Sequence, residues 1–195
     1  MICWRCHEPT GGPVCVGCGV IQPLAPGRDL FALLGLQQQF NLDLDELAKA
    51  YRKVSTAVHP DRFAGKSAVE RRMSLQWMAA VNEARRVLTD RMTRARYLAT
   101  GRAAPEENPR SPGDPEFLEK IFALQMMASD DPEGVKLRAE ELQASVWSQV
   151  EDAFSQWEAD GASLSGVDDM LHQLNYLRTT LRGLSSTVTG LGSGV

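Results

Sequence analysis

The residues best suited to chemistry are four cysteines within the first 18 residues of the 195-residue chain. Cys3 and Cys6 form one Cys-x-x-Cys pair, Cys15 and Cys18 form another, and eight residues separate the pairs. Each pair can aim two thiolates at one ion, and four thiolates complete the tetrahedral shell of a structural zinc site. Because such a shell has no open position, it supports folding rather than catalysis. We predict one structural zinc ion per chain.

Two other roles remain open for the same cysteines. A cytosol keeps thiols reduced, so their clustering favours a metal over disulfides, but redox chemistry or an iron–sulfur cluster would use the same ligands. Nucleic-acid binding is disfavoured, because Arg5 and Arg28 are the only Lys or Arg residues in positions 1–28 and no aromatic-basic stripe accompanies them. We expect no nucleic-acid partner.

A second candidate site is the stretch "TAVHPDRFAGKS", residues 56–67, with His59, Pro60, Asp61 and Arg62 at its centre. A lone His and Asp on an exposed turn have no third group to orient them and no pocket, so acid–base catalysis is disfavoured. Proline fixes the turn, so Asp61 can present its carboxylate to a cationic partner at little further ordering cost. We predict a contact site; the alternative is that His59 and Asp61 only cap two helices.

The helix before this turn carries a cationic face. Lys49, Arg52 and Lys53 are spaced i, i+3 and i+4, so they share one side of a helix. That side is turned away from the apolar stripe, and it would steer and dock an acidic surface. The alternative is an ordinary solvated helix face.

Helices must position these residues. Apolar residues recur every three to four positions from Leu44 to Val58, and Pro60 ends this helix because it pushes the preceding residue out of the α region. Capping boxes are expected at Asp43 with Glu46 and at Ser67 with Glu70. The two long amphipathic helices, joined by residues 59–66, must pack antiparallel. The helices expected in this half cover residues 29–35, 43–59, 67–88 and 90–101.

The second half of the chain predicts a separate domain. "GRAAPEENPRSPG" has the composition of a linker, and three amphipathic segments near 114–129, 132–159 and 167–185 predict a three-helix bundle. The fold class is therefore all-α. The predicted parts are a metal-binding segment at 1–25, a helical domain at 29–101, a linker at 102–113, the bundle at 114–185 and a flexible tail at 186–195.

Charge differs between the two halves. Residues 1–100 hold 14 Lys and Arg against 9 Asp and Glu, a net charge of +5, whereas residues 101–195 hold 7 against 16, a net charge of −9. Opposite signs suggest two different partners. No apolar run is long enough to cross a bilayer, and "MICWRCHEPT" lacks the apolar core of a signal peptide. We expect a cytoplasmic protein with no membrane partner.

"AVHPDRF", with a basic helix before it and "NEARRVLTD" after it, resembles a J-domain. Together with "DLFALLGL", "RARYLATG" and "DPEFLEKIFALQMM", it resembles the HscB family of iron–sulfur cluster assembly, over about residues 29–185. Paired CxxC motifs also occur in some members of that family. The resemblance implies that the J-domain stimulates the ATPase of an HscA- or DnaK-type chaperone and that the bundle holds an IscU-type scaffold.

The first bundle helix carries two apolar stripes. Phe117, Ile121 and Leu124 form one, and Leu118, Phe122 and Met126 form the other. A helix that is apolar on two faces is either sandwiched in a core or presents one face to a partner, and the pattern alone leaves both open. The resemblance implies that Leu118, Phe122 and Met126, with Tyr176 on the last helix, bind the scaffold.

The sequence departs from the family at a few positions. Ala123 and Met126 stand where the family's scaffold face carries acidic residues, and Arg85 stands where an aromatic residue is expected. The favoured function is an adaptor without enzymatic activity, placed between a chaperone ATPase and an iron–sulfur scaffold. The alternatives are a general J-protein that serves DnaK with another client and a zinc-dependent redox or regulatory protein.

Overall fold

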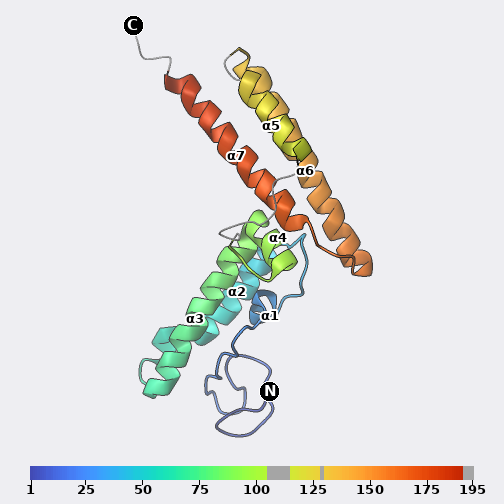
Figure 1. Ribbon diagram of the computed structural model, residues 1–195. Helices are drawn as coiled ribbons and strands as arrows, with labels where there is room; N and C mark the ends of the chain where they lie inside the picture. Colours follow the sequence, from blue (N-terminus) through green and yellow to red (C-terminus); the bar gives the residue numbers. More distant parts are fainter. Residues whose placement is uncertain (105–114, 128–129, 191–195) are drawn as a thin grey trace. The chain divides into compact units, whose positions relative to one another are not determined.

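The computed structural model describes residues 1–104, 115–127 and 130–190, with side chains up to Thr179. Within these ranges every regular element is a helix, and the only β-pairing is two isolated bridges in the first 21 residues. The all-α prediction is confirmed (Figure 1). The chain divides into two compact units, Met1–Arg94 and Ala95–Val195, which are described separately.

The first unit is built on an antiparallel helical hairpin. Helix α2 (Leu44–Val58) packs against α3 (Ala68–Thr89), and the short helix α1 (Leu30–Leu34) also packs on α3 (Figure 1). A 3₁₀ helix, η1 (Pro60–Phe63), forms the turn between α2 and α3. Helix α4 (Arg91–Thr100) follows α3 directly.

Local capping chemistry explains where these helices begin and end. Ser67 and Glu70 form the expected capping box at the start of α3, and Gly35 ends α1 with a left-handed φ of 73°. Asp43 caps α2 through the backbone N–H of Asp45, two residues on, rather than through the expected box with Glu46. Helix α2 ends at Val58, as the following His-Pro pair predicts.

Most of the expected apolar stripes line the core of the hairpin, but Leu44, expected on the buried side of α2, is 51% exposed. On α2, Leu47 and Val58 are buried, and Phe63 closes the turn. Trp77 of α3 is the largest fully buried side chain of the described chain, at 1% exposed. The other buried residues of α3 include Val81, Ala84, Val87 and Leu88.

The second unit contains the predicted three-helix bundle. Helix α5 (Pro115–Met127) packs on α6 (Pro132–Asp160), and α6 packs along α7 (Val167–Gly190). Phe117, Ile121 and Leu124 lie in its buried core together with Val135, Ala139 and Leu177. One of the two α5 stripes is therefore a core stripe.

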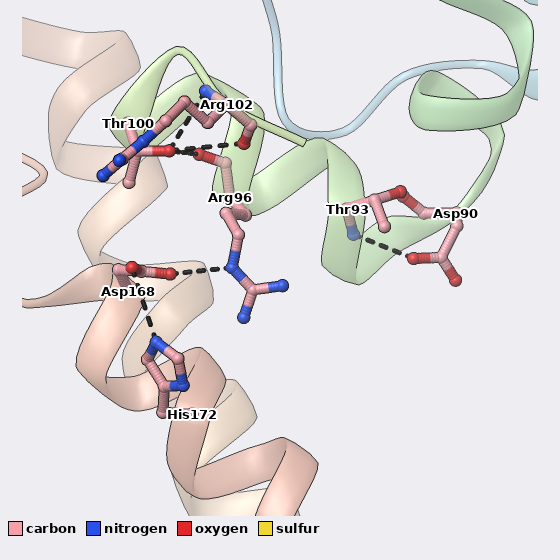
Figure 2. A network of polar contacts seen from close by, with 7 residues as sticks. All are labelled: Asp90, Thr93, Arg96, Thr100, Arg102, Asp168 and His172. Carbon is pink, nitrogen blue, oxygen red and sulfur yellow. Dashed lines mark hydrogen bonds and ion pairs between the residues drawn. The ribbon is translucent and has the colours of Figure 1, made fainter. Parts of the chain in front are cut away.

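A buried ion pair lies at the start of α7 in the second unit (Figure 2). Arg96 Nε donates to Asp168 Oδ1 at 2.8 Å, and the Arg96 side chain is only 6% exposed. His172 Nε2 lies 3.6 Å from the other oxygen of the same carboxylate. Because a buried guanidinium needs a paired anion, removal of either partner would leave a costly unpaired charge.

The element boundaries differ in places from the predicted ones. The two units divide between Arg94 and Ala95, inside α4, whereas the sequence placed a domain end at 101. Helix α7 runs to Gly190, beyond the expected end at 185. Most of the expected linker at 102–113 and the last five residues of the expected tail at 186–195 lie outside the described residues. In the part that is described, no helix has the length and apolarity to cross a membrane.

Candidate functional site

The structure brings the four cysteines of the first unit together. Cys3 Sγ lies 3.7 Å from Cys18 Sγ, Cys6 Sγ lies 3.7 Å from Cys15 Sγ, and all four sulfurs lie within 4.8 Å of one another. A tetrahedron with zinc–sulfur bonds of about 2.3 Å has edges of about 3.8 Å. The cysteines are therefore positioned to bind one metal ion.

Two similar backbone turns hold the sulfurs. His7 N donates to Cys3 O at 3.0 Å, and Gly19 N donates to Cys15 O at 2.9 Å, so each pair closes with the same bond. His7 has a φ of 61° and Gly19 a φ of 70°, both in the left-handed region. His7 thus occupies the turn position that Gly19 fills in the second pair. This position accounts for His7 as a turn residue rather than as a metal ligand. Each turn is also flanked by one isolated bridge, Ile2–Pro9 or Val14–Ile21.

The acidities of the thiols also favour a cation at this point. Burial raises the pKa of Cys3, but hydrogen bonds from the backbone N–H groups of Cys6 and Arg5 outweigh burial. The net result is a pKa of about 6, below the ordinary value of a thiol. The backbone N–H of Glu8 lowers the pKa of Cys6, but burial and the neighbouring sulfurs raise it to about 12. Close thiolates repel one another, so all four ionise together only around a positive ion.

The His-Pro-Asp turn is held by local hydrogen bonds and is largely exposed. His59 caps η1, since its Nδ1 accepts from Asp61 N at 3.3 Å, and Pro60 is the first residue of that helix. The Asp61 side chain is 90% exposed, with its carboxylate 3.4 Å from His59 Nδ1. Arg62 Nη1 donates back to Thr56 O at 3.3 Å. Capping thus occupies His59, as the alternative interpretation proposed, yet it leaves the Asp61 carboxylate available to a partner.

The cationic face predicted on α2 is present. Lys49, Arg52 and Lys53 are all exposed, whereas Leu47 and Val58 on the opposite side of the helix are buried. This face and the turn belong to the same unit and are consecutive in the chain. They form one continuous candidate surface, cationic along α2 and with an anionic carboxylate at its end.

The second stripe of α5 is on the surface of the bundle. Leu118 is 48% exposed, Phe122 64% and Met126 66%, and Ala123 beside them is also exposed. These three side chains are therefore outside the core of the unit, which removes the sandwiched-helix alternative for this chain. They leave an apolar face of the kind that marks protein–protein contacts.

Tyr176 of α7 extends this face. Its ring packs edge-on against Phe117, with ring centres 6.4 Å apart, and Gln125 Nε2 lies 3.5 Å from its hydroxyl oxygen. Gln125 follows Leu118 by two helical turns, so it lies on the same side of α5. Tyr176 is 44% exposed. Residues 50 and more apart in the chain thus contribute to one surface, called here the α5 face: Leu118, Phe122, Met126 and Tyr176.

Two features of the first unit were missed in the sequence. Gln22 is fully buried beside the cysteines, and its backbone carbonyl accepts a hydrogen bond from the Trp77 indole of α3. In the sequence, only its position as a polar residue shortly after the second CxxC pair could have pointed to it. Arg85, noted as a departure from the family, stacks its guanidinium 4.6 Å from the centre of the Tyr51 ring. It thereby covers an aromatic ring across the hairpin as a cation–π partner.

Comparisons with known proteins agree with this geometry. The DnaJ domain family model matches residues 29–97. The co-chaperone protein HscB homolog of Bordetella pertussis is 42% identical over 126 residues, which cover 62% of this chain and 74% of that protein. The iron-sulfur cluster co-chaperone protein HscB homolog of Arabidopsis thaliana is 30% identical over 80% of this chain and 59% of its own length.

A solved structure supports the fold over almost the whole chain. Human co-chaperone protein HscB superposes with a TM-score of 0.72, covering 96% of this chain and 98% of the human one, at 23% identity. At 23% identity the human structure supports only the fold. The family assignment rests on the Bordetella relative, which is 42% identical over 74% of its length. With its J-domain, its exposed His-Pro-Asp turn and its helical bundle, this chain belongs to the HscB family of co-chaperones.

Proposed function

We propose that this protein stimulates the ATPase of an HscA- or DnaK-type chaperone and delivers an IscU-type iron–sulfur scaffold to it. The observation that carries the proposal is the exposed Asp61 carboxylate on a proline-fixed turn beside a cationic helix face. The α5 face supports the second half of the proposal, since it offers an apolar docking surface on a different unit. Two surfaces on two units suit an adaptor that holds two partners.

The protein itself acts without catalysis in this proposal. His59 and Asp61 contact each other on an open turn, and within the described part of the chain no third side chain orients them for proton transfer. Their role is to make contacts that are stronger in one state of the chaperone than in another, because only such differential binding shifts a conformational equilibrium. Hydrolysis remains the chemistry of the chaperone.

Single-turnover ATPase assays test the proposal directly. HscA- and DnaK-type chaperones are each mixed with this protein, with and without an IscU-type scaffold. Stimulation of one chaperone, increased further by the scaffold, is the expected result. Stimulation that responds to denatured proteins but not to the scaffold would instead indicate a general J-protein, and no stimulation of either chaperone would overturn the proposal.

Reversal of the cationic face should weaken chaperone docking. Lys49→Glu, Arg52→Glu and Lys53→Glu together turn an attractive surface into a repulsive one for an acidic partner, so the association rate should fall at least about tenfold at low salt. Added salt should weaken wild-type docking in the same direction, because it screens exposed charges. Stopped-flow association measures both effects.

The matched control makes the same change in net charge elsewhere. Lys136→Glu, Arg138→Glu and Arg178→Glu alter exposed cations of the bundle, so chaperone association should change little. Wild-type docking that does not respond to salt, or an equal loss in the control, would refute a specific role for the α2 face.

The metal proposed for the four cysteines is zinc. Purified protein should contain one zinc ion per chain by elemental analysis, and removal of the metal should disorder the first 25 residues. Structural zinc supplies on the order of 10–16 kcal/mol to segments too small to fold alone, whereas the bundle has its own core and should keep its helicity. Bound iron in place of zinc would favour the redox interpretation.

A further inference from the structure

The cysteine segment packs against helix α3 of the J-domain through a buried hydrogen bond. Trp77 in the middle of α3 is 1% exposed, and its indole N–H donates to the backbone carbonyl of Gln22 at 2.8 Å. The guanidinium of Arg28 lies 5.8 Å from the centre of the Trp77 ring. The largest buried side chain of the hairpin therefore takes its hydrogen-bond acceptor from the cysteine segment.

Gln22 links this contact to the candidate metal centre. Its side chain is completely buried, and its Nε2 donates to Cys3 Sγ at 3.3 Å and to Val20 O at 2.9 Å. Its Oε1 accepts from Trp4 N at 3.3 Å. If the sulfur of Cys3 moves away, a buried amide N–H loses one of its acceptors, which costs free energy.

The same part of α3 also fixes the His-Pro-Asp turn. Ser74 lies one turn before Trp77 on α3, and its buried hydroxyl donates to Val58 O at 2.7 Å. Val58 is the last residue of α2 and directly precedes His59. Hydrogen bonds therefore join Cys3 to Gln22 and Gln22 to Trp77, and one turn earlier on the same helix Ser74 joins α3 to the end of α2.

We propose that metal in the four cysteines controls the packing of α3 and, through it, the order of the His-Pro-Asp turn. Without the metal, a segment of about 25 residues has too little core to stay folded. Gln22 then leaves Trp77, whose indole N–H exchanges a protein acceptor for water and whose apolar ring becomes exposed, which weakens the packing of α3. The metal centre thereby becomes a switch for the stability of the J-domain.

Hydrogen–deuterium exchange on the full chain tests this coupling without any partner protein. Exchange is compared for zinc-loaded protein, chelated protein and protein reloaded with Zn²⁺, with the metal content measured in each sample. Chelation should speed exchange at least about tenfold in residues 59–80 and leave α6 unchanged as an internal reference. Reloading should restore the protection. Exchange that changes only within residues 1–25 would overturn the proposal.

Two tryptophan variants locate the link. Trp77→Phe keeps a ring but removes the N–H donor, so metal should protect α3 less in this variant than in the wild type. Trp157→Phe in α6 is the matched control and should keep the full metal effect. In thermal melts, chelation should lower the J-domain transition by about 4–8 °C in wild type and by clearly less in Trp77→Phe. An equal shift in all three proteins would show that Trp77 is not the link.

A variant that cannot bind metal covers the case in which the chelator fails to remove it. Cys6→Ser with Cys18→Ser changes the two less buried cysteines and should reproduce the exchange pattern of the chelated wild type. The consequence for chaperone stimulation, a loss that follows metal content, rests on the proposed function. If zinc-loaded protein stimulates no chaperone, that function fails, whereas the exchange result stands or falls by itself.

Discussion

His59→Gln and Asp61→Asn should each abolish stimulation of the chaperone ATPase while leaving the fold intact. Asp61→Asn removes one negative charge without changing the shape of a side chain that is 90% exposed. Loss of one member of a desolvated charge pair costs about 2–5 kcal/mol at an interface, which corresponds to at least about a 30-fold loss of productive docking. Single-turnover ATPase rates across a range of co-chaperone concentrations would measure it.

The same variants should unfold like the wild type. Surface substitutions usually change stability by within about 0.5 kcal/mol, although His59 also caps η1 through its Nδ1. The matched control is Glu46→Gln, which removes one exposed negative charge from the first turn of α2 and should leave stimulation unchanged. An Asp61→Asn variant that stimulates normally, or one that has lost its helices, would contradict the contact role.

Helices and their ends could be predicted because their signals are local. The apolar spacing of α2 and α3, the capping box at Ser67 and the stop before Pro60 all act within a few residues, and each appears in the structure. The metal centre was predictable for a similar reason, since Cys-x-x-Cys restricts each pair to one turn. The short helix η1 was missed because its 3₁₀ turn has no periodic pattern of its own.

The contacts that were missed join residues far apart in the chain. Trp77 and Gln22 are separated by 55 positions and Arg85 and Tyr51 by 34, so no local pattern marks them. The sequence also left the two stripes of α5 equivalent, because both are apolar with helical spacing. Only the packing of α6 and α7 decides which stripe is buried, and it buries Phe117, Ile121 and Leu124.

Truncation of the exposed stripe should separate binding from stability. Leu118→Ala, Phe122→Ala and Met126→Ala together should weaken binding of an IscU-type scaffold by at least about a hundredfold, since anchors at a partner face commonly cost more than ~1 kcal/mol each. Side chains that are 48–66% exposed contribute little to the core of the bundle. The thermal transition of the variant should therefore stay within a few degrees of the wild type.

The chain supplies its own matched control on the same helix. Phe117→Ala, Ile121→Ala and Leu124→Ala remove a similar amount of apolar side chain from buried positions. Each such change in a core costs about 2–5 kcal/mol, so this variant should lose the bundle transition itself. Tyr176→Ala tests the α5 face from α7, and Tyr176→Phe keeps the edge contact with Phe117 while removing the hydroxyl near Gln125.

The chemistry of this face also predicts how the two partners respond to salt. Met126 on the α5 face and Ala123 beside it are exposed and carry no charge, so this part of α5 offers apolar rather than ionic contacts. Scaffold binding should therefore change little between low and high salt, whereas chaperone docking through Lys49, Arg52 and Lys53 should weaken.

Titration calorimetry of the exposed-stripe variant and the wild type, with thermal melts alongside, measures whether the stripe serves binding or stability. Large destabilisation with unchanged affinity per folded molecule would place the scaffold site elsewhere on the bundle.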